Sequence, residues 1–233
     1  MVSPVYTIVV LLGASFLLGI TDKAGRPVSL ILFFTALTAS AGLSFVWLYQ
    51  AVFSGMETVA YTAGVLPPLS IALKLGETEA FFLALTSALS LFSAIVIFRR
   101  LSSGHIFIMV LFLLVVLGAQ GLILTTDLFN MFVFLEILSI STAALIGLER
   151  GVSTLSAGFK YMIAAGIVSA FFLIGVAFIY RLTGSLAIQD IASADYAVSS
   201  TAGLAAVFLI AAALLIELKP FPANGWALDV YQS

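Results

Sequence analysis

Three ionisable side chains interrupt apolar stretches of this sequence: Glu136, Glu217 and Lys219. Each is expected at the depth of a lipid bilayer, where burying a carboxylate or an ammonium costs about 2.5–3.5 kcal/mol even on a lenient insertion scale. Such residues usually face the interior of a helix bundle or a hydrated path, and they typically mark the route of an ion. We therefore predict that these three residues take part in moving H⁺ or Na⁺.

Glu136 lies nine residues after Asp127, which can cap the helix that begins there. Nine residues of helix rise about 14 Å, so we expect the carboxyl group near the middle of the membrane. Ser139 is a polar neighbour on the same helix, and we expect a basic side chain close to Glu136. The alternative is a protonated glutamic acid that serves only packing.

Two prolines, Pro220 and Pro222, follow Lys219 closely. Proline removes a backbone donor from a helix, so the last apolar run must break or kink there. Discontinuous membrane helices are typical of transport sites, because their exposed carbonyl and amide groups can bind ions. The alternative is a helix that ends at the membrane surface, with Lys219 reaching lipid headgroups.

Two further side chains are candidates for the same route. Lys160 lies near the start of the sixth apolar run, where it either reaches the cytoplasmic face or points inward towards Glu136. His105, the single histidine, opens the fourth run and is either an interfacial residue or a proton relay.

The elements that position these residues follow from composition. The 233 residues are 63% hydrophobic and 9% charged, whereas a soluble domain carries about 25% charged residues. Lipid leaves no backbone group without a partner, so every span is expected to be a helix. We predict an all-α membrane protein, residues 1–233 as one transmembrane domain, with about seven helices and the last one broken by prolines. The runs are 3–20, 28–49, 80–98, 105–126, 127–148, 158–180 and 201–218.

Several functions are excluded or disfavoured. The sequence has no cysteine and one histidine, so iron–sulfur clusters, disulfides and paired-histidine haem ligation within the chain are excluded. We find no metal-ligand cluster, nucleophile constellation or phosphate-binding loop, and we expect no cofactor and no catalytic centre of its own. A net charge of −2 does not suggest nucleic acid as a partner.

Lys and Arg counts predict the orientation. The loops on one side carry six basic residues and those on the other carry two, Lys74 and Arg181. Because cytoplasmic loops are enriched in Lys and Arg, we expect a multi-pass protein of the cell membrane with its N-terminus outside and its C-terminus cytoplasmic. The loop 50–79 is then external, and its glycines and prolines favour a folded hairpin.

Three stretches resemble a known family. Residues 127–139 (DLFNMFVFLEILS) are similar to the fifth-helix signature of the antiporter-like subunits. These include the large membrane subunits of respiratory complex I, the D subunit of Mrp sodium/proton antiporters and the matching subunits of membrane-bound hydrogenases. Residues 159–186, from FKY to LTGSL, resemble the sixth helix and its following loop, and residues 222–232 (PANGWALDVYQ) resemble the broken seventh helix.

The resemblance implies a fold and a site. Residues 1–100 would form three leading helices with the external hairpin, and residues 105–233 part of the first of two inverted repeats. The second repeat would come from another chain or be absent. Glu136 matches the family's fifth-helix glutamate. Glu217 occupies the position of its partner lysine, and Lys219 follows two residues later, which turns a helix by about 200°.

We therefore expect a subunit of a multi-subunit membrane complex that translocates H⁺ or Na⁺, with other membrane subunits as partners. The first alternative is a non-conducting scaffold subunit of such a complex. The second is a stand-alone transporter of a small molecule. Copurification with other subunits would separate the last from the first two.

Overall fold

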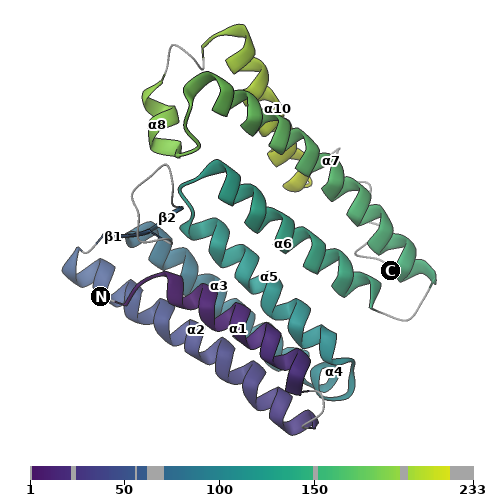
Figure 1. Ribbon diagram of the computed structural model, residues 1–233. Helices are drawn as coiled ribbons and strands as arrows, with labels where there is room; N and C mark the ends of the chain where they lie inside the picture. The colour runs from purple at the N-terminus through teal and green to yellow at the C-terminus, as the bar shows by residue number, and fades with distance from the viewer. Residues whose placement is uncertain are drawn as a thin grey trace. The chain divides into compact units, whose positions relative to one another are not determined.

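The computed structural model describes residues 2–21, 25–55, 57–61, 71–148, 152–194 and 199–220. Helices make up most of this part of the chain (Figure 1). The described residues divide into two compact units. The first holds the described residues up to Thr125 except Ile71, and the second holds Ile71 and the described residues from Thr126 onward.

The first unit contains four long helices: α1 (Val5–Thr21), α2 (Arg26–Ser54), α3 (Glu77–Val96) and α5 (Ile106–Leu124). A short helix, α4 (Phe98–Ser103), precedes α5. Helix α1 packs against α2 and α5, and α3 packs against the same two helices. Large apolar side chains fill the space between them, among them Leu11, Phe33, Trp47, Leu83, Met109 and Leu113, all fully buried.

Two short strands connect α2 to α3 in the loop that we expected to form a hairpin. Strands β1 (Thr58–Tyr61) and β2 (Ala72–Leu75) pair antiparallel. Leu73 of β2 is buried and bridges to Thr125 after α5, so the strand lies against the helices of this unit. The prolines at 67 and 68 lie outside the described residues.

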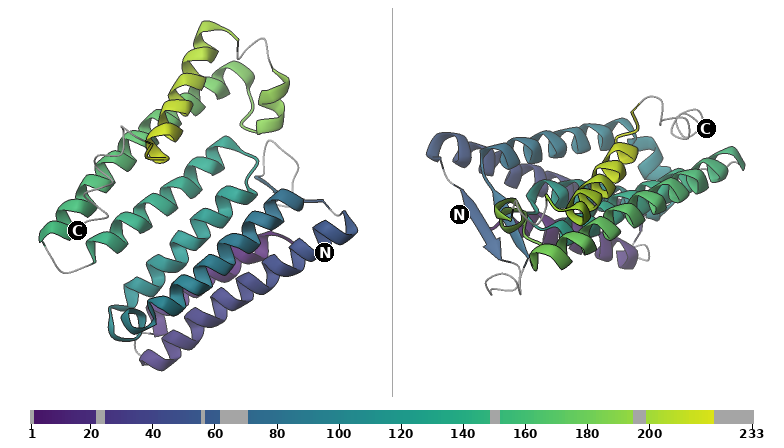
Figure 2. Two further views of the ribbon diagram at one scale, coloured as in Figure 1. Left: turned by 180° about the vertical axis from the view of Figure 1, so that it is seen from behind. Right: turned by 90° about the horizontal axis from the view of Figure 1, so that it is seen from above.

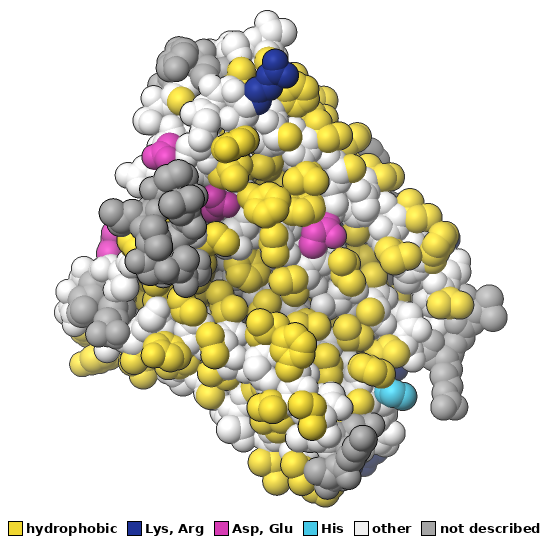
Figure 3. Space-filling model, in the orientation of Figure 1, with side chains coloured by type: hydrophobic (Ala, Val, Ile, Leu, Met, Phe, Trp, Pro, Cys, Tyr) yellow, Lys and Arg dark blue, Asp and Glu magenta, His cyan; other side chains and the backbone are white. Residues whose placement is uncertain are grey.

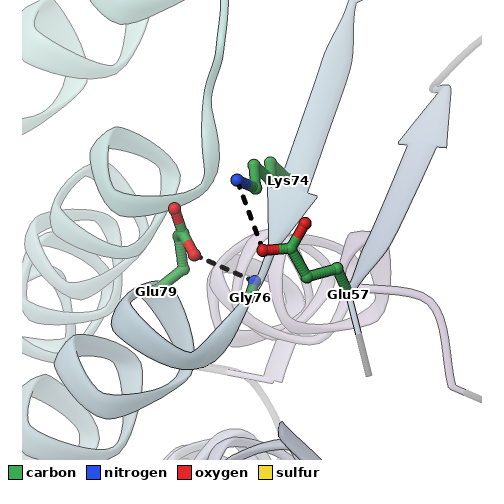
Figure 4. Close-up of polar contacts among 4 residues, drawn as sticks. All are labelled: Glu57, Lys74, Gly76 and Glu79. Atoms are coloured by element: carbon green, nitrogen blue, oxygen red, sulfur yellow. Dashed lines mark hydrogen bonds and ion pairs between the residues drawn. The ribbon is translucent and has the colours of Figure 1, made fainter. Parts of the chain in front are cut away.

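Polar contacts fix the junction between β2 and α3 (Figure 4). The Gly76 N–H donates a hydrogen bond of 2.9 Å to the Glu79 carboxylate, which satisfies a free donor at the helix start. Lys74 lies 3.6 Å from Glu57 on the neighbouring strand segment. Both side chains are substantially exposed, so this ion pair adds little to stability.

The second unit is built on α7 (Val152–Thr183), which packs against α6 (Leu128–Gly147) and α10 (Thr201–Glu217) (Figures 1 and 2). A short helix, α8 (Ile188–Ser193), lies between α7 and α10 in the sequence. The predicted cap at Asp127 is confirmed, because its carboxylate accepts a 2.8 Å hydrogen bond from the Asn130 N–H.

Within the part of the chain that the structure describes, five helices are long and apolar enough to cross a membrane: α2, α3, α5, α6 and α7. Helices α1 and α10 are apolar but shorter, with 17 residues each, which is still within the range of about 17–25 residues for a span. Hydrophobic side chains cover most of the face drawn in Figure 3. Phe16 and Phe208, for example, are each 72% exposed. The prediction of an all-α, multi-pass membrane protein is confirmed.

Candidate functional site

Among the described residues, the side chain that Glu136 contacts carries a hydroxyl group and no basic group. It lies in the middle of α6, partly buried, and its carboxylate accepts a hydrogen bond from Ser169 of α7. We had expected a lysine or arginine beside it, and within the described residues the contact comes from serine instead. The hydroxyl leaves the net charge of the site unchanged while it fixes one carboxylate oxygen.

Close packing of α6 and α7 permits this contact. A Cβ atom added at Gly158 of α7 would lie 3.3 Å from the Ala143 carbonyl oxygen and 3.3 Å from the Gly147 nitrogen. Gly158 therefore lets the two backbones approach more closely than larger residues would. Ser139, the predicted polar neighbour, is buried in α6, and its hydroxyl makes no hydrogen bond within the described residues.

The second pair of predicted residues, Glu217 and Lys219, lies at the end of α10. Two residues of continuous helix would turn Lys219 about 200° away from Glu217. Instead α10 ends at Glu217, and Lys219 adopts a left-handed backbone conformation with φ of 53°. This brings the Lys219 Nζ to 3.7 Å from the Glu217 Oε1.

Tyr161 completes this second site from α7. The Lys219 ammonium lies over its ring, 5.4 Å from the centroid. Tyr161 precedes Ser169 by eight residues, which is about 12 Å along a helix. The Glu217–Lys219 pair and the Glu136–Ser169 contact thus meet α7 at two positions about two turns apart along its length.

The other two candidates lie apart from these contacts. Lys160 is exposed on α7 and is nine residues, or about two and a half turns, before Ser169. His105 is the exposed N-cap residue of α5 in the first unit, where its ring stacks on Phe107 at 5.2 Å between centroids. Among the described residues, no group of three or more His, Cys, Asp or Glu could hold a metal ion.

A buried polar network in the first unit was not predicted. Gln120 of α5 accepts a 2.5 Å hydrogen bond from Thr7 of α1 and donates to Ser40 of α2 at 3.0 Å and to Ser87 of α3 at 2.9 Å. Ser44 lies 3.0 Å from Ser87 through their hydroxyl oxygens. All five side chains are at most 2% exposed. The network holds no ionisable group, so it ties four helices together rather than binding a charge.

Comparison with known proteins identifies the class. Residues 125–233 match the family described as "NADH:quinone oxidoreductase/Mrp antiporter, TM". NADH-quinone oxidoreductase subunit N from Desulforudis audaxviator (strain MP104C) is 38% identical over 122 residues, which are 52% of this chain and 24% of the relative. The chain is therefore similar to the antiporter-like family of membrane subunits, and this similarity supports the resemblance seen in the three sequence stretches.

Two solved structures share the fold. A chain of the membrane-bound sulfane sulfur reductase, an archaeal respiratory membrane complex, matches with a TM-score of 0.92 and 31% identity. That match covers 98% of this chain and 47% of the other. A chain of the Mrp complex from Dietzia sp. DQ12-45-1b matches with a TM-score of 0.84 and 26% identity, over 99% of this chain and 44% of the other. The chain therefore spans less than half the length of these structural relatives.

Proposed function

We propose that the chain is a subunit of a multi-subunit membrane complex that translocates H⁺ or Na⁺, and that Glu136 is the ion-binding group of its second unit. The observation that supports this most directly is the contact between Glu136 and Ser169. A carboxylate inside an apolar helix is costly unless its oxygens have partners. Here a hydroxyl from a neighbouring helix supplies one, and the other oxygen stays available for a proton or a cation.

The comparisons support the proposal at the level of the family. The solved relatives are chains of multi-subunit membrane complexes, and the matched family is named for quinone oxidoreductases and Mrp antiporters. We propose that the chain brings no redox centre or catalytic group to such a complex and serves the movement of ions. Other membrane subunits and lipid are its partners.

We propose the Glu217–Lys219 pair as the second charged site on the ion route. Opposite charges a few ångströms apart each stabilise the ionised form of the other. Protonation of Glu217 therefore weakens its electrostatic attraction for Lys219, and deprotonation of Glu217 strengthens that attraction. The roles predicted for Lys160 and His105 remain proposals of the same kind, as groups that deliver ions at the membrane surfaces.

One observation favours a second candidate, a non-conducting scaffold subunit. The lysine is paired locally with Glu217, and its platform Tyr161 lies about 12 Å along α7 from the Glu136 contact. In this arrangement the electrostatic interaction between Glu136 and the Glu217–Lys219 pair is weak. A subunit that only occupies the place of an ion-conducting one would tolerate such a separation.

Ion flux through the assembled complex separates the two candidates. The complex is purified through a tag on this chain and reconstituted into liposomes with an internal pH dye. A potential or a sodium gradient is then imposed, and H⁺ movement and ²²Na⁺ uptake are measured. Glu136→Gln should lower flux at least about tenfold, because the amide cannot carry the charge. Ser169→Ala should lower it about threefold to tenfold, since it removes a hydrogen bond to a charged group.

Thr142→Val is the matched control on the same helix. Its hydroxyl donates to the Leu138 carbonyl of its own turn at 2.7 Å and does not reach Glu136 within the described contacts. This variant should transport like the wild type. If the complex assembles with Glu136→Gln and moves ions at the wild-type rate, the scaffold function holds and the conducting one does not.

A further inference from the structure

Lys219 is held between two groups from different helices. Its ammonium lies 3.7 Å from the Glu217 carboxylate of α10 and 5.4 Å from the centroid of the Tyr161 ring of α7. The Lys219 and Glu217 side chains are 21% and 20% exposed, so both charges are largely removed from solvent. At this depth each electrostatic contact is stronger than it is in water.

The Tyr161 ring is a fixed platform. Tyr161 is 6% exposed and packs with Ala143 of α6 and Ala165 of its own helix, against which Ile146 also packs. These contacts bury the ring between α6 and α7. The ring face therefore stays available to a cation that approaches from the end of α10.

The backbone of Lys219 is adapted to this position. A φ of 53° is uncommon for a residue with a side chain, and such conformations persist only where surrounding contacts maintain them. The ion pair to Glu217 and the ring contact are two contacts of that kind. A right-handed continuation of the helix would carry the ammonium away from both.

We propose that Tyr161 is a positioning residue for ion translocation, which keeps the Lys219 ammonium over its ring and beside Glu217. This inference rests on the proposed function. The negative face of an aromatic ring attracts a cation without adding a net charge and without competing for a proton. When Glu217 is protonated, its attraction for the ammonium falls, whereas the attraction of the ring for Lys219 is unchanged.

Two described groups face the Lys219 ammonium. Glu217 faces Lys219 from α10 itself, and Tyr161 faces it from α7, the helix against which α10 packs. Lys160 adjoins Tyr161 in sequence but is exposed, whereas Tyr161 is buried. Lys160 therefore serves as an internal reference for the chemistry of Lys219.

The experiment measures the reactivity of the Lys219 amine in the purified complex. Acetic anhydride acylates only the neutral amine, so an ammonium held over the ring reacts slowly. Labelling of Lys219 is followed by mass spectrometry relative to Lys160. Tyr161→Phe keeps the ring and should leave labelling within about twofold of the wild type, whereas Tyr161→Leu should raise it about threefold to tenfold.

A fluorinated ring separates electrostatics from packing. A tetrafluorinated phenylalanine at position 161 keeps the ring shape but removes most of the negative face. It should raise Lys219 labelling as Tyr161→Leu does and lower ion flux in the liposome assay, with complex assembly intact. If labelling stays at the wild-type level, the ring acts only in packing and the inference fails.

Failure of the proposed function would look different. If Glu136→Gln transports normally while the fluorinated ring still exposes Lys219 to acylation, the contact between Tyr161 and Lys219 stands and the ion route through Glu136 does not. If the fluorinated ring changes labelling but leaves flux unchanged in a complex where Glu136→Gln is inactive, Tyr161 has no positioning role in transport.

Discussion

At the scale of single residues, neutral polar groups make buried side-chain contacts between helices in both units. Ser169 supplies the contact to Glu136, and Gln120 joins four helices of the first unit through hydroxyl groups. A neutral partner avoids the desolvation cost that a second buried charge would add. The carboxylate of Glu136 thus gains a hydrogen-bond partner without a second buried charge beside it.

The Gln120 network should be important for stability. Gln120→Leu keeps a similar volume but leaves the hydroxyls of Thr7, Ser40 and Ser87 without their amide partner. A buried polar group left without any partner costs about 1–3 kcal/mol. Because Thr7 and Ser40 still contact each other and Ser87 still bonds the Leu83 carbonyl, the total loss should stay at about 2–4 kcal/mol. Thermal unfolding of the detergent-solubilised protein measures the change.

Thr38→Val is the control for this prediction. Thr38 is exposed on α2, and its hydroxyl bonds only to carbonyl groups of its own helix among the described contacts. A change within about 0.5 kcal/mol is expected there. Equal midpoints for Gln120→Leu and the wild type would mean that the network does not hold the helices together.

The free-energy cost of burying a charge explains which site residues could be identified from the sequence. Glu136, Glu217 and Lys219 stand out because a charged residue in an apolar run is costly to bury and is usually functional. Ser169 and Ser40 do not, because serine is common in membrane helices and can bond its own turn. The direction of Lys219 depends on a left-handed backbone angle at a residue other than glycine, which no local pattern signals.

At the scale of elements, glycine positions determine how closely helices pack. A Cβ atom added at Gly175 of α7 would lie 2.6 Å from Ile210 Cγ1 and 3.0 Å from the Ala206 carbonyl oxygen of α10. The Ala206 carbonyl oxygen belongs to the helix backbone and cannot move aside as the end of a flexible side chain can. Gly175 therefore sets the approach of α10 to α7, and with it the place where Lys219 meets Tyr161.

Gly175→Ala should separate α7 from α10. Overpacking of this kind costs about 1–3 kcal/mol, and the displaced α10 should also raise the acylation rate of Lys219. Gly166→Ala on the same helix is the control, because a Cβ atom there meets nothing within 4 Å. That change should be neutral or stabilise the helix by up to about 1 kcal/mol. The same unfolding midpoint for both variants would contradict the close approach.

The elements themselves were largely predictable. Apolar runs of bilayer length marked the seven main helices, and Asp127 marked the start of α6. The glycines and prolines of the loop 50–79 predict the hairpin that the strands β1 and β2 form, although each strand is only four residues long. The sequence did not predict the short helices α4 and α8, six residues each, because local propensity is weak over one or two turns.

At the scale of the whole molecule, the orientation in the membrane is still a prediction. Six basic residues in the loops of one side against two on the other place the first side in the cytoplasm. Helix α3 separates Glu57 from Ser102, and its 20 residues are long enough to cross the hydrocarbon core. The two positions should therefore label from opposite sides.

Single-cysteine labelling tests this directly, because the sequence contains no cysteine. Glu57→Cys should react with a membrane-impermeant maleimide added to intact cells, since the Glu57 side chain is 67% exposed. Ser102→Cys, next to the basic pair Arg99 and Arg100, should react only after the membrane is permeabilised. The unsubstituted chain should give no signal in either condition. The reverse pattern would place the N-terminus inside, and it would put the end of α10, with Glu217 and Lys219, on the external side of the membrane.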